Sequence, residues 1–120
     1  MRPPLILDAS ALVALFAGHP PIFRLWQRAD QGNLTLVLPA GAILDASAEL
    51  HASDTAWAPV LYPADVVATS LTPDIAIHIG QQSGDLATRH VIWEARAVRG
   101  VVVTRRPDLY QPGAAPVLVL

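Results

Sequence analysis

The side chains of this sequence whose type and spacing could do chemistry are carboxylates. Asp8 directly follows the apolar run Leu5–Leu7, which is typical of a short buried strand. Asp45 and Glu49 lie one helical turn apart after a helix-starting proline, so they share a helix face. Asp85 begins the clearest amphipathic stretch of the chain. Acids distributed in this way indicate a site assembled from several segments.

The edge of a parallel sheet is where these acids are expected to meet. The carboxyl ends of the strands in an open α/β sheet lie along one edge, and ligands bind in the crevice there. Asp8, Asp85 and the segment 104–108 are all expected at that edge. Carboxylates gathered in one place repel one another unless a cation is present. Oxygen ligands of this kind suit Mg²⁺ or Mn²⁺.

The elements that position these acids are predicted from hydrophobic periodicity and from the prolines and glycines. Short apolar runs alternate with helical stretches, which favours a mostly parallel sheet with helices on both faces. The predicted fold is a three-layer α/β/α sandwich formed by a single domain of residues 1–120. We expect strands at 5–7, 34–38, 66–69, 101–103 and 116–120, and helices at 10–17, 22–31, 40–50, 73–82 and 85–99.

Two further local features follow from the same patterns. Residues 51–63 contain two prolines and a lone tryptophan, and we expect them to form a loop. Gly100 follows the last predicted helix and is expected to act as its C-cap.

Composition excludes several kinds of chemistry. The chain has no cysteine, which rules out disulfides, thiolate metal sites and a thiol nucleophile. All eight basic residues are arginine, so a P-loop lysine and Schiff-base chemistry are excluded as well. No G-x-G-x-x-G motif is present for a dinucleotide. A phosphoacceptor or dehalogenase-like site would want a lysine and a second aspartate near position 10, where Ser10 stands.

Hydropathy and charge point to a globular protein with an uneven surface. The chain is 52% apolar, yet no apolar run approaches the ~18 residues needed to span a bilayer. We therefore expect a cytoplasmic protein that does not associate with a membrane. Residues 1–84 carry three arginines against seven acids, whereas residues 85–120 carry five arginines against three acids. The basic C-terminal third is compatible with a polyanionic partner.

Four segments together resemble the PIN-domain ribonucleases, a family that includes toxins of the VapBC toxin–antitoxin type. The first is the opening strand with its acid at 5–12, and the second is the proline-started helix at 38–45. The third is the helix start at 84–91, and the fourth is the strand at 101–104 that leads into the family's Thr-x-Asp. The order and spacing of these segments agree with the family over nearly the whole chain.

The resemblance implies a PIN-like fold and a metal-dependent endoribonuclease, the toxin of a type II toxin–antitoxin pair. Its catalytic residues would be Asp8, Asp45 and Asp85. Of these, Asp8 and Asp85 would hold Mg²⁺ or Mn²⁺ as the cofactor, with Asp45 helping directly or through water. Ser10 and Thr104 would support the site.

Partners are implied as well. RNA would be the substrate, with its backbone bound by Arg89, Arg105 and Arg106. An antitoxin protein would be the second partner. We also expect a homodimer, because the first two helices should leave an exposed apolar patch. The residues of that patch are Phe16, Phe23 and Trp26.

Two positions depart from the family pattern. Asp45 stands where glutamate is usual, and Arg106 stands at the acid of the Thr-x-Asp motif. The Arg106 guanidinium reverses the local charge, so it would compete with a second cation, though it could also contact a phosphate. Asp108 is the candidate replacement as a metal ligand. A second hypothesis therefore stands beside the first, namely a degenerate PIN fold that binds RNA or a protein partner without cleaving it.

Each acid also has a purely structural interpretation. Asp85 is a good helix N-cap candidate, Glu49 a solvated helix residue and Asp108 a turn residue. Asp8 is the hardest to explain in that way, because a charge at the end of a buried strand needs a partner. The four histidines, His90 among them, fit no metal-ligand spacing, so we interpret them as incidental.

Overall fold

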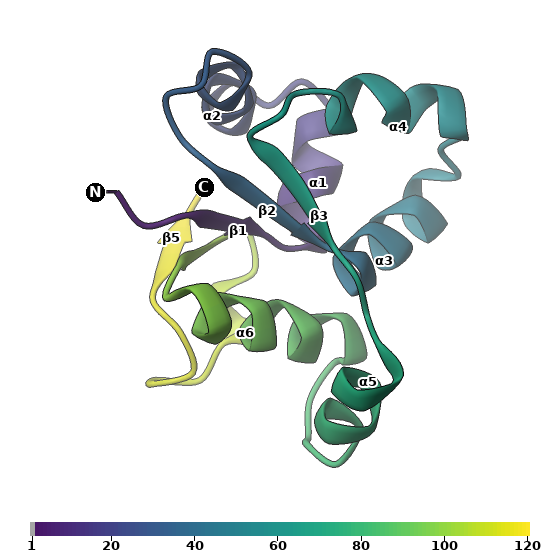
Figure 1. Ribbon diagram of the computed structural model, residues 1–120, viewed down its shortest axis with the longest axis vertical. Helices are drawn as coiled ribbons and strands as arrows, with labels where there is room; N and C mark the ends of the chain where they lie inside the picture. Colours follow the sequence, from purple (N-terminus) through teal and green to yellow (C-terminus); the bar gives the residue numbers. More distant parts are fainter. Residues whose placement is uncertain (1) are drawn as a thin grey trace.

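The computed structural model describes residues 2–120, and its centre is a sheet of five parallel strands (Figure 1). The strands are β1 (Leu5–Leu7), β2 (Leu36–Pro39), β3 (Val66–Thr69), β4 (Val101–Thr104) and β5 (Val117–Val119). Their order in the sheet is β3-β2-β1-β4-β5, so the first strand of the chain lies in the middle. The predicted parallel sheet is confirmed.

The register of β1 and β4 determines what lies at the carboxyl edge of the sheet. Leu7, the last residue of β1, is paired with Val103. The next residues of the two strands, Asp8 and Thr104, are therefore neighbours at this edge. Both strands are apolar because helices cover both faces, and neither Leu7 nor Val103 is exposed to solvent.

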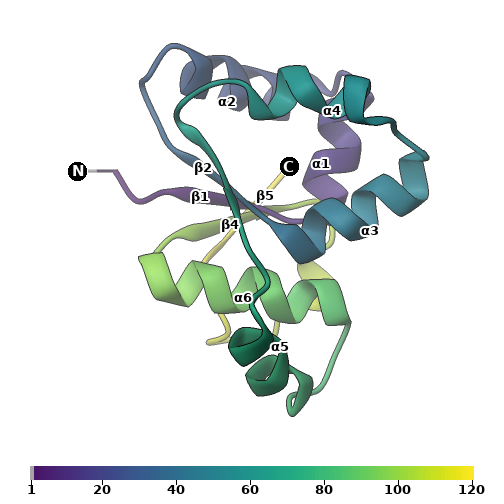
Figure 2. The same ribbon diagram turned by 45° about the vertical axis from the view of Figure 1, so that its right-hand side comes forward.

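Helices cover the two faces of the sheet and complete the predicted three-layer sandwich (Figure 2). One face carries α1 (Ala9–Phe16), α2 (Pro20–Asp30) and α4 (Asp54–Leu61), and the other carries α5 (Pro73–Gly80) and α6 (Leu86–Val98). Helix α3 (Ala40–Leu50) lies at the carboxyl edge and packs against both α1 and α6. Across residues 2–120, every helix falls short of the length and apolar character that a membrane span requires.

Residues 51–63 are not the loop that the sequence predicted, because they contain α4. Ser53 caps this helix by accepting a hydrogen bond from the Ala56 N–H, and Trp57 is buried in the core. Pro59 lies inside the helix, and because proline is typical of loops, the sequence pattern did not predict a helix here. A proline costs a helix one backbone hydrogen bond, and burial of the Trp57 indole offsets that cost.

The same helix removes most of the predicted apolar patch. Phe16 meets Trp57 edge-on with ring centroids 4.7 Å apart, and Trp26 Nε1 donates a hydrogen bond to the carbonyl oxygen of Val60. Phe16 and Trp26 are therefore half-buried, and only Phe23 remains exposed. The prediction of a three-residue exposed patch is wrong because α4 covers two of its members.

Gly100 has a different role from the predicted one. The left-handed residue at the end of α6 is Arg99, with φ of 54°, and Gly100 follows it. A Cβ at position 100 would lie 2.6 Å from the Pro4 carbonyl oxygen and would also collide with the Ile6 side chain. The glycine is needed because two backbone segments approach closely there.

Candidate active site

Asp8 is held at the junction between β1 and α1 by three hydrogen-bond donors. Its side chain is the N-cap of α1, with Oδ1 accepting hydrogen bonds from the Ala11 N–H at 2.9 Å and from the Ser10 hydroxyl at 2.7 Å. The Tyr110 hydroxyl donates to Oδ2 at 2.9 Å. Asp8 is only 3% exposed, and within residues 2–120 it has no ion-pair partner. The buried carboxylate of Asp8 is thus stabilised by neutral hydrogen-bond donors and not by an ion pair.

Tyr110 is a site residue that sequence reasoning missed. It follows the short 3₁₀ helix η1 (Pro107–Leu109) and is buried against Asp8. Burial raises the pKa of Tyr110, and the nearby charge of Asp8 raises it further, so the phenol stays protonated and donates its hydrogen bond. Asp8 and Tyr110 are 102 residues apart, and no local pattern signals their contact.

We expect Tyr110→Phe to lower the free energy of unfolding by about 1–3 kcal/mol at neutral pH, because Asp8 would lose a buried donor. The loss should shrink above pH 10, the ordinary pKa of the phenol. There the unfolded wild type ionises Tyr110 while the folded protein does not, so the wild type loses its advantage. Urea unfolding at pH 7 and about pH 11 measures both effects. Tyr62→Phe is the control, since Tyr62 is exposed, and an equal loss in both variants would contradict this role.

Ser10 and Thr104 join Asp8 to the loop that follows β4. The Ser10 oxygen accepts a hydrogen bond from the Arg105 N–H at 2.9 Å and lies 3.3 Å from Thr104 Oγ1. Thr104 Oγ1 in turn accepts a hydrogen bond from the Arg106 N–H at 2.8 Å. The loop 104–110 is therefore attached to Asp8 at its start through Ser10 and at its end through Tyr110.

Asp85 begins α6 and is confirmed as the N-cap of this helix. Its Oδ2 accepts hydrogen bonds from the Thr88 N–H at 3.0 Å and from the Thr88 hydroxyl at 2.9 Å, as expected of an N-cap. Its Oδ1 accepts no hydrogen bond from any described residue, and the side chain is exposed. One carboxylate oxygen of Asp85 is thus free to face the pocket.

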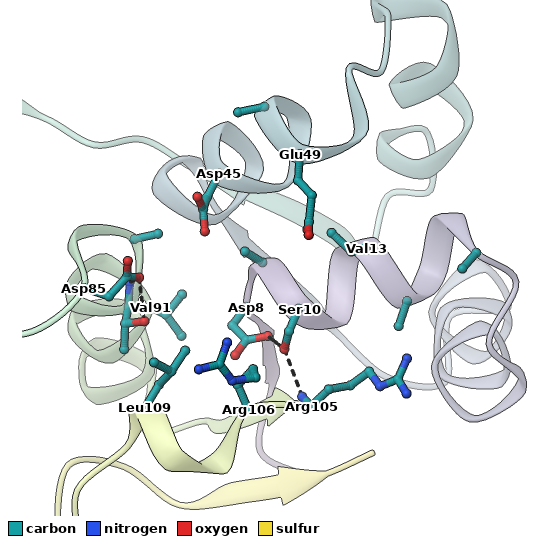
Figure 3. A pocket seen from close by; sticks show the side chains of 16 residues that line it. Asp8, Ser10, Val13, Asp45, Glu49, Asp85, Val91, Arg105, Arg106 and Leu109 are labelled. Carbon is teal, nitrogen blue, oxygen red and sulfur yellow. Dashed lines mark hydrogen bonds between the residues drawn. The ribbon is translucent and has the colours of Figure 1, made fainter.

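A pocket of about 680 Å³ at the carboxyl edge brings the predicted acids together (Figure 3). It is lined by Asp8 from the end of β1, by Asp45 and Glu49 from α3, and by Asp85 from the start of α6. Asp45 and Glu49 are exposed and point into the pocket, and no described residue donates a hydrogen bond to them. Glu49, expected to be merely solvated, is therefore part of the pocket wall.

The donor chemistry of this pocket suits Mg²⁺ or Mn²⁺, which prefer carboxylate oxygens. In the described part of the chain, however, no three acid or histidine side chains approach closely enough to hold an ion together. Magnesium sites commonly use only one or two protein carboxylates, completed by water and substrate phosphates. The pocket therefore suits a cation held by one or two carboxylates and by water, rather than one surrounded by protein ligands.

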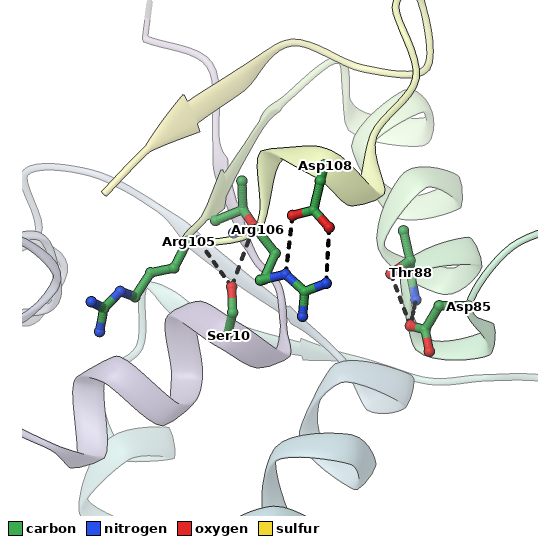
Figure 4. Close-up of polar contacts among 7 residues, drawn as sticks. Ser10, Asp85, Thr88, Arg105, Arg106 and Asp108 are labelled. Carbon is green, nitrogen blue, oxygen red and sulfur yellow. Dashed lines mark hydrogen bonds and ion pairs between the residues drawn. The ribbon is translucent and has the colours of Figure 1, made fainter.

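Arg106 lines the pocket, and Figure 4 shows its pairing with Asp108. Its guanidinium forms two hydrogen bonds to Asp108, from Nε to Oδ1 at 3.0 Å and from an Nη to Oδ2 at 2.8 Å. This pairing raises the pKa of Arg106, with smaller contributions from Asp8 and Asp85, and lowers the pKa of Asp108. Asp108 does not line the pocket, so the structure does not bring this predicted metal ligand to the other acids.

The other two predicted RNA-binding arginines differ from each other. Arg105 lines the pocket, but its guanidinium points away from the acids (Figure 3). Arg89 does not line it, because its guanidinium donates to the carbonyl oxygens of Gly84 and Ile79. Arg89 therefore ties the α5–α6 connection to α6.

His90 is not incidental, since it joins the two helices that carry Asp45 and Asp85. The ring is buried, and its Nδ1 accepts a hydrogen bond from the Gly41 N–H at 3.0 Å at the start of α3. The ring proton must then lie on Nε2, which is 3.2 Å from Glu94 Oε1. Gly41 permits this approach, because a Cβ there would lie 3.1 Å from the His90 Cβ.

The five-stranded parallel sheet with helices on both faces is a PIN-like α/β fold. A solved structure shows the likeness: the chain is similar to the crystal structure of VapBC2 from Rickettsia felis bound to a DNA fragment from their promoter, with a TM-score of 0.66 over 98% of each chain. Sequence identity in that comparison is 12%, so the likeness concerns the fold. No protein-family model matches the sequence, and no curated protein matches it.

Proposed function

We propose that the protein is a PIN-like, metal-dependent endoribonuclease, the toxin of a type II toxin–antitoxin pair. The observation that carries this proposal is the pocket at the carboxyl edge of the sheet, lined by four carboxylates from three separate segments. Such a collection of acids is unfavourable without a cation, and RNA phosphates bring cations with them. The structural likeness to VapBC2 supports the toxin–antitoxin assignment.

In this proposal Asp8 and Asp85 hold Mg²⁺ or Mn²⁺, with Asp45 assisting. When bound, the ion polarises the phosphodiester and lowers the pKa of a water molecule. The chain's own contribution is orientation. The donors Ser10 and Tyr110 hold the Asp8 carboxylate at a fixed angle, and Thr88 does the same for Asp85.

Arg105 and Arg106 are the proposed contacts to the RNA backbone, because both line the pocket. Arg89 is left out of this set, since it does not line the pocket. An antitoxin protein is the proposed partner. A homodimer is the proposed assembly, although only Phe23 of the apolar patch from which it was predicted is exposed. We propose the cytoplasm as the location.

A second candidate function is favoured by Arg106. Its positive charge at the acid pocket weakens the attraction of a cation, so the protein would bind RNA or a protein partner without cleaving it. On either account we expect the wild type to be at most a weak nuclease.

One assay separates the two candidates. Cleavage of a labelled single-stranded RNA is measured with Mg²⁺, with Mn²⁺ and with EDTA, and binding of the same RNA is measured in EDTA. Metal-dependent cleavage that disappears in Asp8→Asn supports the nuclease. Binding without any cleavage supports the second candidate, and the absence of both contradicts the proposed function.

A further inference from the structure

The Asp108 carboxylate occupies the Nε–Nη2 edge of the Arg106 guanidinium, one of the two edges with which an arginine can bind a phosphate through two hydrogen bonds. We propose that Asp108 is a built-in competitor, and that an RNA phosphodiester binds Arg106 by displacing the Asp108 carboxylate. This inference rests on the proposed RNA ligand, but it does not depend on cleavage or on a metal ion.

The geometry of the pair is the basis of the inference. Two parallel hydrogen bonds, at 3.0 and 2.8 Å, join one edge of the guanidinium to the two oxygens of Asp108. The two non-bridging oxygens of a phosphodiester present the same bidentate pattern to an arginine. While Asp108 holds this edge of Arg106, a phosphate cannot use it.

A phosphate can replace the Asp108 carboxylate on Arg106 without a change in the fold. The side chains of Arg106 and Asp108 are 57% and 61% exposed, so water screens their attraction and the pair is weak. Other contacts hold the loop 104–110 in place. The Arg106 N–H donates a hydrogen bond to Thr104 Oγ1, and the Tyr110 hydroxyl donates one to Asp8. Displacement of Asp108 is therefore a side-chain movement on a fixed loop.

The surrounding charges explain why a competitor matters at this position. Arg106 lines the pocket together with four carboxylates, which repel a phosphate, and it is one of two arginines there. The Asp108 carboxylate paired with Arg106 offsets part of the attraction of this arginine for RNA. Removing the charge of Asp108 should thus strengthen the attraction between Arg106 and a phosphate.

The experiment measures binding of a short single-stranded RNA by fluorescence anisotropy, in EDTA and at low salt. Asp108→Asn should lower the Kd by about two- to fivefold, the range expected when an exposed competing ion pair is removed. Arg106→Gln should raise the Kd, and adding Asp108→Asn to it should have little further effect. Asp30→Asn is the matched control, because Asp30 is an exposed acid that does not line the pocket and its loss changes the net charge equally.

Each outcome has a defined meaning. A larger gain for Asp108→Asn than for Asp30→Asn, abolished in the Arg106→Gln background, supports competition. Equal gains for both variants would show a general charge effect and overturn the inference, while RNA binding itself stands. A protein that binds no RNA in any form would overturn the proposed function and this inference together. Thermal unfolding of each variant verifies that these exposed substitutions leave the fold intact.

Discussion

Asp8→Asn is expected to lower the affinity of the protein for Mn²⁺ by at least ~100-fold and to remove any metal-dependent cleavage. Loss of a residue that merely orients a metal ligand costs about 10–100-fold in affinity, so loss of a charged ligand should cost no less. The amide would also present an N–H₂ group to its surroundings, where Tyr110 and Ser10 donate hydrogen bonds to both oxygens of Asp8. We therefore expect a simultaneous loss of stability of about 1–3 kcal/mol.

The stability change has to be separated from the loss of binding. Calorimetric titration with Mn²⁺ at a temperature where the variant is folded measures affinity directly, and urea unfolding measures stability. Glu49→Gln is the matched control, because Glu49 lines the same pocket but is exposed and accepts no hydrogen bond from any described residue. We expect a smaller effect on Mn²⁺ affinity for this variant. Unchanged Mn²⁺ affinity in Asp8→Asn would exclude Asp8 as a ligand.

Arg106→Asp is expected to raise Mn²⁺ affinity by about tenfold or more and to raise the metal-dependent cleavage rate with it. The substitution removes a cation and adds an anion beside Asp8 and Asp85, a change of two charge units at the proposed metal position. It also places an acid at the position where one was expected from the sequence. Mn²⁺ titration and cleavage of labelled single-stranded RNA give the two readouts.

Arg105→Asp is the control for the Mn²⁺ titration, and cleavage is not compared in this variant because Arg105 is itself a proposed RNA contact. It makes the same change in charge one residue earlier, at a side chain whose guanidinium points away from the acids (Figure 3). A comparable gain in both variants would indicate a general electrostatic effect. If Arg106→Asp gains nothing and Asp108→Asn lowers Mn²⁺ affinity as much as Asp8→Asn does, then Asp108 already supplies the fourth acid and this account of Arg106 fails.

Local patterns were sufficient to predict the sheet and the segments that carry the acids. The apolar run before Asp8 and the helix start at Asp85 each reflect interactions within a few residues, namely strand burial and N-capping. The meeting of these segments at one edge then follows from parallel strand order. For this reason the fold and the shared pocket of Asp8 and Asp85 could be predicted from the sequence, whereas Asp45 was expected there from the resemblance.

The contacts that hold those acids in position were not predictable in the same way. Tyr110 reaches Asp8 across 102 residues, and the role of His90 depends on how α3 packs against α6. Neither the Tyr110–Asp8 contact nor the His90–Gly41 contact can be predicted from the spacing of residues in the sequence. The helix α4 was missed for a different reason, since Pro59 suggested a loop while the capping hydroxyl of Ser53 and the burial of Trp57 favour a helix.

The central claim is that Asp8 and Asp85 hold a divalent cation. Anomalous diffraction from a crystal soaked in Mn²⁺ tests it most directly, because the Mn²⁺ signal locates the ion independently of any activity. The account predicts an anomalous peak between the carboxylates of Asp8 and Asp85, with water or Asp45 completing the coordination. A soaked crystal with no such peak, in which Arg106 still lies beside these acids, would contradict the claim.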